Sequence, residues 1–370
     1  MHDPIALAIP TFFVAIGVEY AIARKKGREV YRLADAVTDL SCGVTSQLAN
    51  VFVGAMLLAA YDKVYSGYRL VTWQSSWVVW TLAFFGVDFL YYWWHRLSHE
   101  VNVLWAAHVV HHQSEDYNLA VALRQAVVTH FTFLPFYLPL AFLGVPTLVY
   151  AIMVAISTLY QFWIHTELVP VVRGPLGYVL NLPSHHRVHH ARDAHYLDKN
   201  YAAILIVWDR LFGTFVEESE PPHYGLTKPL GTFSPLWAQV HYFVELGERM
   251  WKLPRLSDKL LLPFRSPAWQ GEGEEKHLPP AEKYDVQVSR GTQVYVVVQY
   301  FLVLVGAFLV LFYKFEASLR VLALSSFAVL LGVVSIGALL ENKRWARGLE
   351  AVRLVVTAGL VVLVLRQLGS

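Results

Sequence analysis

Histidines at helical spacing are the residues of this chain whose type and pattern could do chemistry. They recur three or four residues apart, so on helices their imidazoles would project from one face. A lone histidine on an apolar face is usually a hydrogen-bonded core residue. A pattern repeated three times instead predicts a metal site, because imidazole binds iron, zinc, copper and nickel. The three clusters are His95 and His99; His108, His111 and His112; and His186, His189 and His190.

A further candidate ligand, His165, ends an apolar run, and Gln161 lies one turn earlier, where it could hold a metal-bound water. With His165 the candidates number nine. One transition ion takes about four to six ligands, so nine imply two ions. Zinc sites are usually closed at about four ligands, often with thiolates, and do no redox chemistry. An all-nitrogen pair of sites at a membrane boundary therefore indicates iron and oxygen chemistry.

Three other polar residues are expected to support the ligands. Asp88 precedes His95 by seven residues, which places it two turns along the same helix face. A carboxylate in so apolar a stretch requires a reason, and orienting an imidazole through its second nitrogen would supply one. Asp209 could do the same, or could belong to a structural ion pair in the stretch 208–210. His185 is expected to support the site without binding the metal.

Composition indicates an integral membrane protein. The 370 residues are 56% hydrophobic and only 16% charged, with a mean hydropathy of +0.41, and soluble domains are usually more charged. The net charge of +2 provides no basic field that would favour nucleic acid. Cys42 is the only cysteine, which excludes an intrachain disulfide framework and an iron–sulfur cluster.

Eight apolar runs predict an all-α membrane protein with about eight transmembrane helices and a cytoplasmic histidine-rich helical cap that holds a di-iron site. The expected domains are 1–75, N-terminal membrane helices; 76–215, the histidine-motif core; 216–292, a cytoplasmic polar region and linker; and 293–370, a three-helix membrane segment. The polar stretch 271–277 is expected to be an exposed linker. The runs are about 5–23, 40–60, 77–94, 127–143, 148–164, 294–312, 319–340 and 354–365.

Two basic loops predict the orientation of these helices. Placing the loop 24–32 in the cytoplasm puts the N-terminus outside, and counting spans then puts every histidine cluster inside. The second basic loop, 343–347, falls on the same side. We therefore expect a multi-pass protein of the bacterial inner membrane or the endoplasmic reticulum, with its active site on the cytoplasmic side.

The order of the histidine motifs and the sequence around them resemble those of a known enzyme family. The order His-x-x-x-His, His-x-x-His-His, His-x-x-His-His resembles the fatty acid hydroxylase and sterol desaturase superfamily of membrane di-iron enzymes. Within it the chain is most similar to the alkylglycerol monooxygenase family, and the similarity extends over nearly the whole chain. The motifs that carry it include the stretches 88–100, 114–118, 122–125, 162–167, 183–190, 198–201, 208–215, 224–227 and 335–337.

This resemblance implies an oxygenase that hydroxylates the ether-linked carbon of an alkylglycerol. The hemiacetal would collapse to a fatty aldehyde and glycerol. Two iron ions, O2, a membrane lipid substrate and tetrahydrobiopterin as a separate electron donor are implied with it. The resemblance also places Glu100 in the active-site motif, although a carboxylate there could merely charge a helix end. We assign catalytic roles to Glu100 and Asp88.

Two other classes of function remain open. The histidine clusters equally fit a hydroxylase or desaturase of a fatty acyl chain, a sterol or a carotenoid, because substrate choice depends on the cavity. A metal-binding membrane transporter is the distant alternative. Transporters place their ligands near the middle of the bilayer, whereas these clusters lie at the ends of the apolar runs. An inactive scaffold would have no use for nine retained ligands.

Overall fold

The computed structural model describes residues 4–269 and 282–368, and within them every regular element is a helix. Two isolated β-bridges, Leu180 with Leu205 and Ala191 with Tyr224, tie loops together. The expected all-α fold is therefore confirmed for the described residues. The stretch 271–277, which we predicted to be an exposed linker, lies outside them.

In the part of the chain that the structure describes, four helices are long and apolar enough to cross a membrane. They account for four of the eight expected spans, and the chain is a multi-pass membrane protein. The second of them has 36 residues, about 54 Å at 1.5 Å per residue, so it continues well beyond the bilayer core. These helices are α1 (Pro4–Lys25), α2 (Leu33–Tyr68), α12 (Arg290–Phe312) and α13 (Leu319–Leu340).

The other four expected spans are also helical, but the structure does not establish that they cross. Two form a hairpin of 14 and 17 residues, about 21 and 26 Å long, which is shorter than the roughly 30 Å hydrocarbon core. A third is rich in tryptophan and tyrosine and ends in charged residues. These helices are α3 (Ser76–Glu100), α5 (Thr129–Phe142), α6 (Thr147–Trp163) and α14 (Ala346–Leu368).

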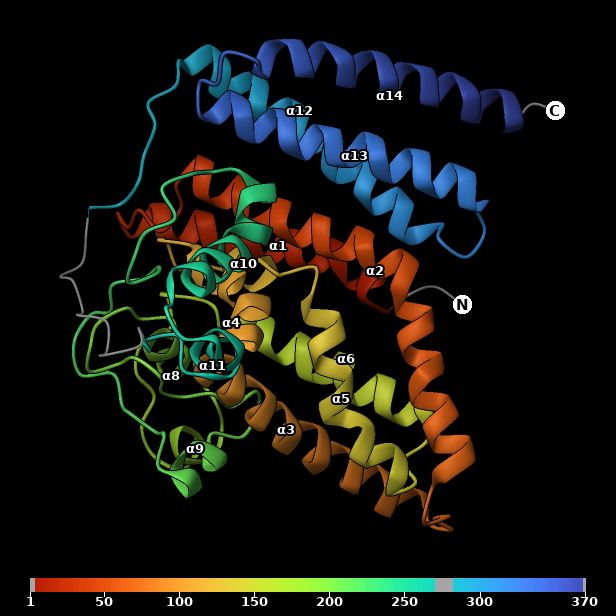
Figure 1. Cartoon of the computed structure of the whole chain (residues 1–370). Coiled ribbons are helices and arrows are strands. Elements are labelled where there is room, and N and C mark those ends of the chain that lie inside the picture. The colour runs from red at the N-terminus through yellow and green to blue at the C-terminus, as the bar shows by residue number, and fades with distance from the viewer. Residues whose placement is uncertain (1–3, 270–281, 369–370) are drawn as a thin grey trace.

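The long helices form two layers on either side of α2 (Figure 1). On one side α12 and α13 pack against each other and against α2, and α14 lies on the outer side of α13, while α3, α5 and α6 pack on the other. The core between α2, α12 and α13 contains Val296, Val333 and Ile336, each fully buried. Because α2 contacts both layers, it is the element against which the rest of the chain is aligned.

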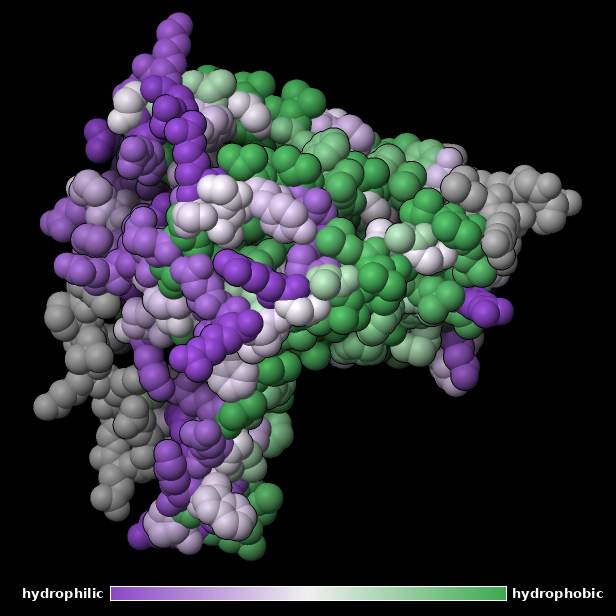
Figure 2. Space-filling view, turned by 90° about the horizontal axis from the view of Figure 1, so that it is seen from above, coloured by the Kyte–Doolittle hydropathy of each residue, from purple (hydrophilic) through white to green (hydrophobic). Residues whose placement is uncertain are grey.

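Short helices gather at one end of this bundle, on the left in Figure 1. The hydrophilic residues lie at the same end, and hydrophobic residues cover most of the remaining surface in view (Figure 2). This polar end includes α4 (Asn102–His108), the 3₁₀ helices η1 (Val109–Gln113), η2 (Val121–Leu123) and η3 (Leu262–Phe264), and α7 (Pro175–Val179), α8 (Pro183–His189), α9 (Val207–Phe212), α10 (Pro235–Lys252) and α11 (Leu256–Leu261).

Both basic loops belong to this polar end. In the first, Arg32 Nε lies 3.0 Å from Asp116 Oδ1, and Arg28 Nη2 lies 2.7 Å from Glu167 Oε2. At the second, Glu341 Oε1 accepts a hydrogen bond of 2.8 Å from the Thr232 hydroxyl. The structure therefore places the two basic loops and the histidine clusters at one end of the molecule, as the sequence predicted, without showing which side of a membrane that is.

Close packing of α2 against η2 fixes the position of the histidine-bearing loop that precedes η2. Gly43 of α2 faces the Leu123 carbonyl so closely that a methyl group at this position would overlap its oxygen. Next to this contact, Arg124 Nη1 binds Asp39 Oδ1 of α2 at 3.0 Å, and both side chains are almost completely buried. The loop is thus attached to α2 by shape and by charge.

Candidate metal centre

All nine histidines predicted as ligands come together, and they form two groups. Within each group the candidate ligand nitrogens lie within 4.8 Å of one another, and all nine side chains are buried. No other grouping of histidine, cysteine or acidic residues within the described residues has the geometry of a metal site. The five-histidine group is His95, His99, His108, His112 and His189; the four-histidine group is His111, His165, His186 and His190.

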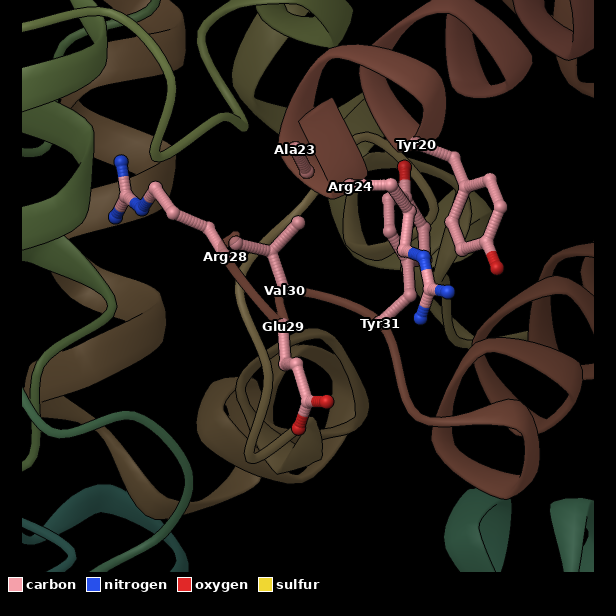
Figure 3. A pocket seen from close by; sticks show the side chains of 7 residues that line it. All are labelled: Tyr20, Ala23, Arg24, Arg28, Glu29, Val30 and Tyr31. Atoms are coloured by element: carbon pink, nitrogen blue, oxygen red, sulfur yellow. The ribbon is translucent and has the colours of Figure 1, made fainter. Parts of the chain in front are cut away.

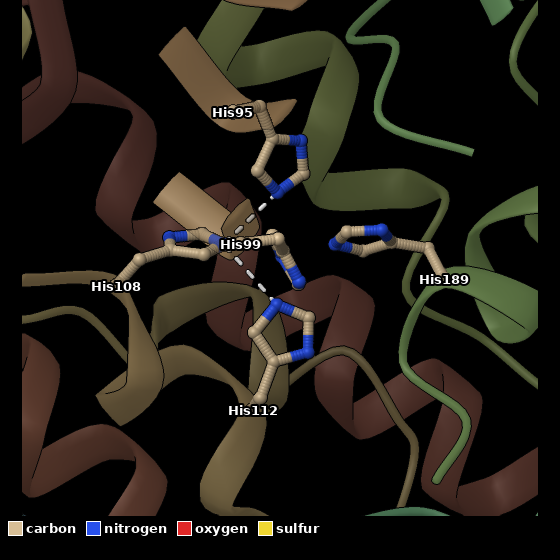
Figure 4. A group of neighbouring side chains, drawn as sticks. All are labelled: His95, His99, His108, His112 and His189. Atoms are coloured by element: carbon tan, nitrogen blue, oxygen red, sulfur yellow. Dashed lines mark hydrogen bonds between the residues drawn. The ribbon is translucent and has the colours of Figure 1, made fainter. Parts of the chain in front are cut away.

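The five-histidine group is assembled from three segments. His95 and His99, one turn apart at the end of α3, face His108 and His112 across the turn into α4 and η1 (Figure 4). His189 of α8 completes the group from the opposite side (Figure 4). The Nε2 atom of His108 lies 2.9 Å from that of His95 and 3.1 Å from that of His112. Five imidazoles thus converge on one small volume.

The four-histidine group lies beside the first and uses the neighbouring residues of the same motifs. His111 belongs to η1, His165 follows the end of α6, and His186 and His190 belong to the α8 region. The Nε2 atom of His165 lies 3.2 Å from that of His111 and 3.0 Å from that of His186. The rings of His112 and His190, one from each group, stack with centroids 4.4 Å apart, so the two groups are in contact.

Backbone carbonyls orient four of the imidazoles. Since a carbonyl oxygen can only accept, each Nδ1 must donate, which leaves Nε2 as a lone pair aimed into the group. Both groups thereby offer metal-binding lone pairs, and none of these four rings needs a carboxylate to orient it. The pairs are His95 Nδ1 with Tyr201 O at 2.7 Å, His111 with Arg124 O at 2.9 Å, His165 with Gln161 O at 2.7 Å and His189 with Lys199 O at 2.9 Å.

This arrangement fits a cation. His111 and His165 both donate through Nδ1, so their Nε2 lone pairs face each other at 3.2 Å, and like lone pairs repel unless a positive charge lies between them. The Nε2 atoms of His99, His189 and His190 are buried without any hydrogen-bond partner. Buried polar atoms are normally paired. A metal ion in each group would satisfy these nitrogens.

Burial favours the uncharged form of seven of these imidazoles. It lowers the pKa of His111 to about 4, and it lowers the pKa of His108, His112 and His165 well below the ordinary value of 6.5. The neighbouring imidazoles act in the same direction. The same burial lowers the pKa of His186, His189 and His190. At neutral pH these nitrogens are therefore free to bind a metal, since no proton competes for them.

We predicted that Asp88 orients a ligating imidazole, but the structure shows that it does not. Its carboxylate accepts hydrogen bonds from the backbone amides of Ile204 and Leu205, at 2.8 and 3.1 Å, and from the Trp208 indole at 2.9 Å. The Nδ1 atom of His95 is occupied by the Tyr201 carbonyl instead. The physical reason is that a carboxylate buried in an apolar helix satisfies the unpaired amides that face it. Asp88 therefore holds the loop that follows residue 201.

Asp209 likewise acts on backbone and contacts no ligand directly. Its two oxygens accept from the amides of Tyr201 and Ala202, at 2.8 and 2.9 Å, and from the Thr214 hydroxyl at 2.6 Å. Asp209 therefore does not hydrogen-bond to an imidazole directly, which was one of the two roles considered for it, and no ion pair of Asp209 is formed among the described residues. Because Tyr201 holds His95, Asp209 supports the five-histidine group through the loop.

Gln161, His185 and Glu100 also lie close to the site. The Gln161 amide turns back to the Ser157 carbonyl at 3.2 Å, so its backbone and not its side chain serves His165. His185 accepts a hydrogen bond from the Leu182 amide at 3.3 Å and stacks edge-on against Phe215, outside both groups. Glu100, next to His99, accepts a hydrogen bond of 2.9 Å from Arg96 and has a side chain 41% exposed.

The sequence analysis missed Arg124 and its partner Asp39. Arg124 is 2% exposed, and its guanidinium binds Asp39 and the Val110 carbonyl while its own carbonyl holds His111. A usable signal was present, because Asp35 and Asp39 are carboxylates one turn apart in an otherwise apolar helix, and such residues are generally functional or paired.

A cavity of about 170 Å³ lies near the first basic loop (Figure 3). Its lining includes Tyr20, Arg24, Arg28 and Tyr31. The guanidinium groups of Arg24 and Arg28 point in different directions (Figure 3), and Arg28 is engaged by Glu167. The cavity is smaller than the roughly 300 Å³ at which ligand pockets begin, and no histidine lines it, so we do not assign the lipid chain to it.

Comparison with known proteins defines the class of this chain. The family model described as fatty acid hydroxylase matches residues 80–214, the segment that contains all nine histidines. No solved structure matches the chain. The helical membrane fold and this segment together define a membrane protein with a fatty acid hydroxylase domain.

Longer similarity narrows the class further. The alkylglycerol monooxygenase of Homo sapiens is 41% identical over 370 residues, which cover 95% of this chain and 81% of that protein. The alkylglycerol monooxygenase of Xenopus tropicalis is 40% identical over 366 residues, 95% and 80% of the two chains. That of Danio rerio is 43% identical over 342 residues, 88% and 74% of the two chains. This chain belongs to the alkylglycerol monooxygenase family, and it is an oxidoreductase of the monooxygenase class.

The grouping of the histidines predicts the metal content. We expect the purified protein, loaded with ferrous iron, to bind two ions per chain, and His112→Ala or His186→Ala to retain one. Each substitution removes a nitrogen from only one group, and loss of one ligand lowers affinity by at least about tenfold. Elemental analysis after brief chelation measures the ratio. One ion in the unaltered protein, or complete loss of metal in both variants, would contradict the division into two groups.

Proposed function

We propose that this chain is a di-iron monooxygenase that hydroxylates the ether-linked carbon of an alkylglycerol, yielding a fatty aldehyde and glycerol. The observation that carries the proposal is the pair of buried all-imidazole groups in a chain about two-fifths identical to alkylglycerol monooxygenases. Uncharged nitrogen ligands without thiolates favour iron over a closed structural zinc site. When bound, the two irons would supply the activation of O2.

The atoms of this reaction balance with one external reductant. One oxygen atom of O2 enters the C–H bond next to the ether oxygen, and the other leaves as water. Two electrons and two protons come from a separate donor, for which we propose tetrahydrobiopterin. The resulting hemiacetal breaks its bond to the ether oxygen, so the carbon chain leaves as an aldehyde and the glycerol oxygen takes a proton.

The protein residues hold the imidazoles in position and exclude water from the histidine groups. The carbonyls of Tyr201, Lys199, Arg124 and Gln161 keep four imidazoles aimed inward. Burial of all nine rings excludes bulk water, which limits loss of oxidising equivalents to solvent. The apolar helices α3 and α6 deliver His95 and His165 to the site, and we propose that a lipid tail reaches it from between such helices.

The substrate is tested by isotope. With an alkylglycerol, tetrahydrobiopterin and ¹⁸O2, we expect a fatty aldehyde, trapped at once by reduction, to carry ¹⁸O while the released glycerol carries none. His189→Ala should show no turnover, because no neighbouring side chain replaces the lost nitrogen. Mass spectrometry distinguishes the products. If the alkylglycerol stays intact while a fatty acid, sterol or carotenoid is oxidised, the chain is a hydroxylase or desaturase of those lipids instead.

We propose a proton-transfer role for Glu100. It adjoins the ligand candidate His99, and its side chain is 41% exposed, so it lies between the buried group and solvent. Proton transfer of this kind contributes about 10²- to 10⁴-fold to a rate.

Glu100→Gln tests this role because it keeps the shape and removes the charge. We expect turnover to fall by about 100-fold or more while both metal ions are retained. If the residue serves only its ion pair with Arg96, the substitution costs less than about 1 kcal/mol of stability. Unchanged turnover would then exclude the role. Steady-state rates and elemental analysis of the same preparation separate the two outcomes.

We propose eight transmembrane helices with the histidine end in the cytoplasm of a bacterium or on the cytoplasmic face of the endoplasmic reticulum. The support is the positive-inside rule, since both basic loops contact the polar end. Under this proposal α3, α5, α6 and α14 cross with the four longer helices. The short hairpin of α5 and α6 would require local thinning of the bilayer.

Cysteine labelling in intact cells tests this topology in a Cys42→Ser background. We expect Gln74→Cys, in the turn between α2 and α3, to react with a membrane-impermeant maleimide. Lys26→Cys and Lys343→Cys, in the two basic loops, should react only after the cells are opened. All three positions are exposed to solvent. Labelling of either basic loop from outside would reverse the orientation.

A further inference from the structure

One short loop serves three of the five imidazoles in the five-histidine group. The carbonyl of Lys199 holds His189 Nδ1 at 2.9 Å, and the carbonyl of Tyr201 holds His95 Nδ1 at 2.7 Å. The carboxylate of Asp198 lies 3.6 Å from His99 Nδ1. We call residues 198–201 the orienting loop.

The backbone of the orienting loop has an unusual conformation. Asp198 and Asn200 have φ values of 57° and 56°, the left-handed region that non-glycine residues seldom adopt. Asparagine and aspartate tolerate this region best, and β-branched residues avoid it. Such a conformation persists only where the surroundings enforce it. It sets the direction of the two carbonyls that hold His189 and His95.

The surroundings enforce it through buried hydrogen bonds. The Asn200 side chain, 0% exposed, donates to the carbonyls of His185 and Val216 at 3.0 and 2.7 Å and accepts from the Val216 amide at 2.8 Å. The backbone amide of Asn200 donates a hydrogen bond of 3.1 Å to the Thr214 carbonyl. At the next residue, Asp209 accepts a hydrogen bond from the backbone amide of Tyr201. The loop is therefore fixed at its second left-handed residue, Asn200, and at Tyr201.

The four-histidine group is oriented from different places. His111 is held by the carbonyl of Arg124 and His165 by the carbonyl of Gln161, and neither residue lies in or contacts the orienting loop through the hydrogen bonds described. The imidazoles of the two groups are thus oriented by different carbonyls, although their rings touch and the Asn200 side chain also binds the His185 carbonyl of α8.

We propose that the orienting loop is the positioning element of the five-histidine group alone, so that its left-handed backbone sets the affinity of one of the two metal positions. This rests on the two-ion site of the proposed function. Asp198 and Asn200 are positioning residues, because their left-handed backbone sets the direction of the carbonyls that hold His95 and His189. A change in the loop should weaken one ion and leave the other in place.

Asp198 offers a matched pair of variants. Its side chain is 62% exposed, so substitutions there do not disturb the core. Asp198→Gly keeps the left-handed conformation without cost, whereas Asp198→Val opposes it. We expect Asp198→Gly to retain two iron ions per chain. Asp198→Val should bind one of them at least about tenfold more weakly, the range seen when ligand-orienting groups are lost.

Elemental analysis across a chelator series gives the two affinities without any turnover. A double variant, Asp198→Val with His186→Ala, identifies the ion: it should retain none tightly, because His186 belongs to the other group. Thermal unfolding in detergent verifies that each variant is folded.

The possible outcomes separately test the role of the backbone conformation, its restriction to one group, the two-ion site and the substrate. If Asp198→Val binds both ions as tightly as Asp198→Gly does, the backbone conformation does not set affinity and the inference is overturned. Equal weakening of both ions in the single variant overturns its restriction to one group. Fewer than two ions in the unaltered protein would overturn the two-ion site itself. Failure to oxidise an alkylglycerol, with both affinities as expected, would refute only the proposed substrate.

Discussion

Hydrogen bonds from imidazole Nδ1 to backbone carbonyls are the constraint on which the site depends. Each one fixes both the tautomer and the direction of a ring, so the geometry of the histidine groups is inherited from the loops that supply the carbonyls. Those loops are held by buried polar side chains: Asp209 binds the amide of Tyr201, and the Arg124 guanidinium binds Asp39 of α2. The histidine site is therefore attached to the membrane helices. The attachment is the part of α2 near Gly43 and Asp39.

Buried charge makes this junction specific but also vulnerable. Arg124 and Asp39 are 2% and 0% exposed, and removing one partner of such a pair leaves an uncompensated charge at a cost of about 3–5 kcal/mol. The Arg124 guanidinium also binds the Val110 carbonyl and Gln113, which lie on either side of His111 and His112. Loss of this pair would therefore disturb the positions of ligand candidates from both groups.

Sequence spacing identified eight of the nine histidines, because helical periodicity is a local property, and His165 was predicted from its place at the end of an apolar run. Spacing did not predict how the nine divide into two groups. Residues four apart share a group, as His108 and His112 do, and residues three apart do not, as His108 and His111 show. On a helix, positions four apart differ by about 40° in direction, and positions three apart differ by about 60° in the opposite direction. Histidines three and four residues along a helix from the same histidine therefore point to opposite sides of it, and their rings enter different groups. The remaining differences depend on contacts distant in sequence. Asp88 meets amides more than a hundred residues later, and no local pattern reveals that a loop carbonyl will orient His95.

Three buried carboxylates, those of Asp39, Asp88 and Asp209, have partners other than the imidazoles, and this has an electrostatic consequence. Asp88 and Asp209 are directed at backbone amides, Asp39 is neutralised by Arg124, and both candidate metal groups consist only of histidines. Imidazole binds a metal in its neutral form, so nothing among the ligands would offset the charge of two divalent ions. A site of this kind remains strongly cationic within a low-dielectric surrounding, where electrostatic attraction is strong. It would thereby favour the gain of negative charge by O2 as it is reduced. The same lack of anionic ligands explains why the imidazoles require so rigid a backbone support, because only geometry holds them against one another before the metal arrives.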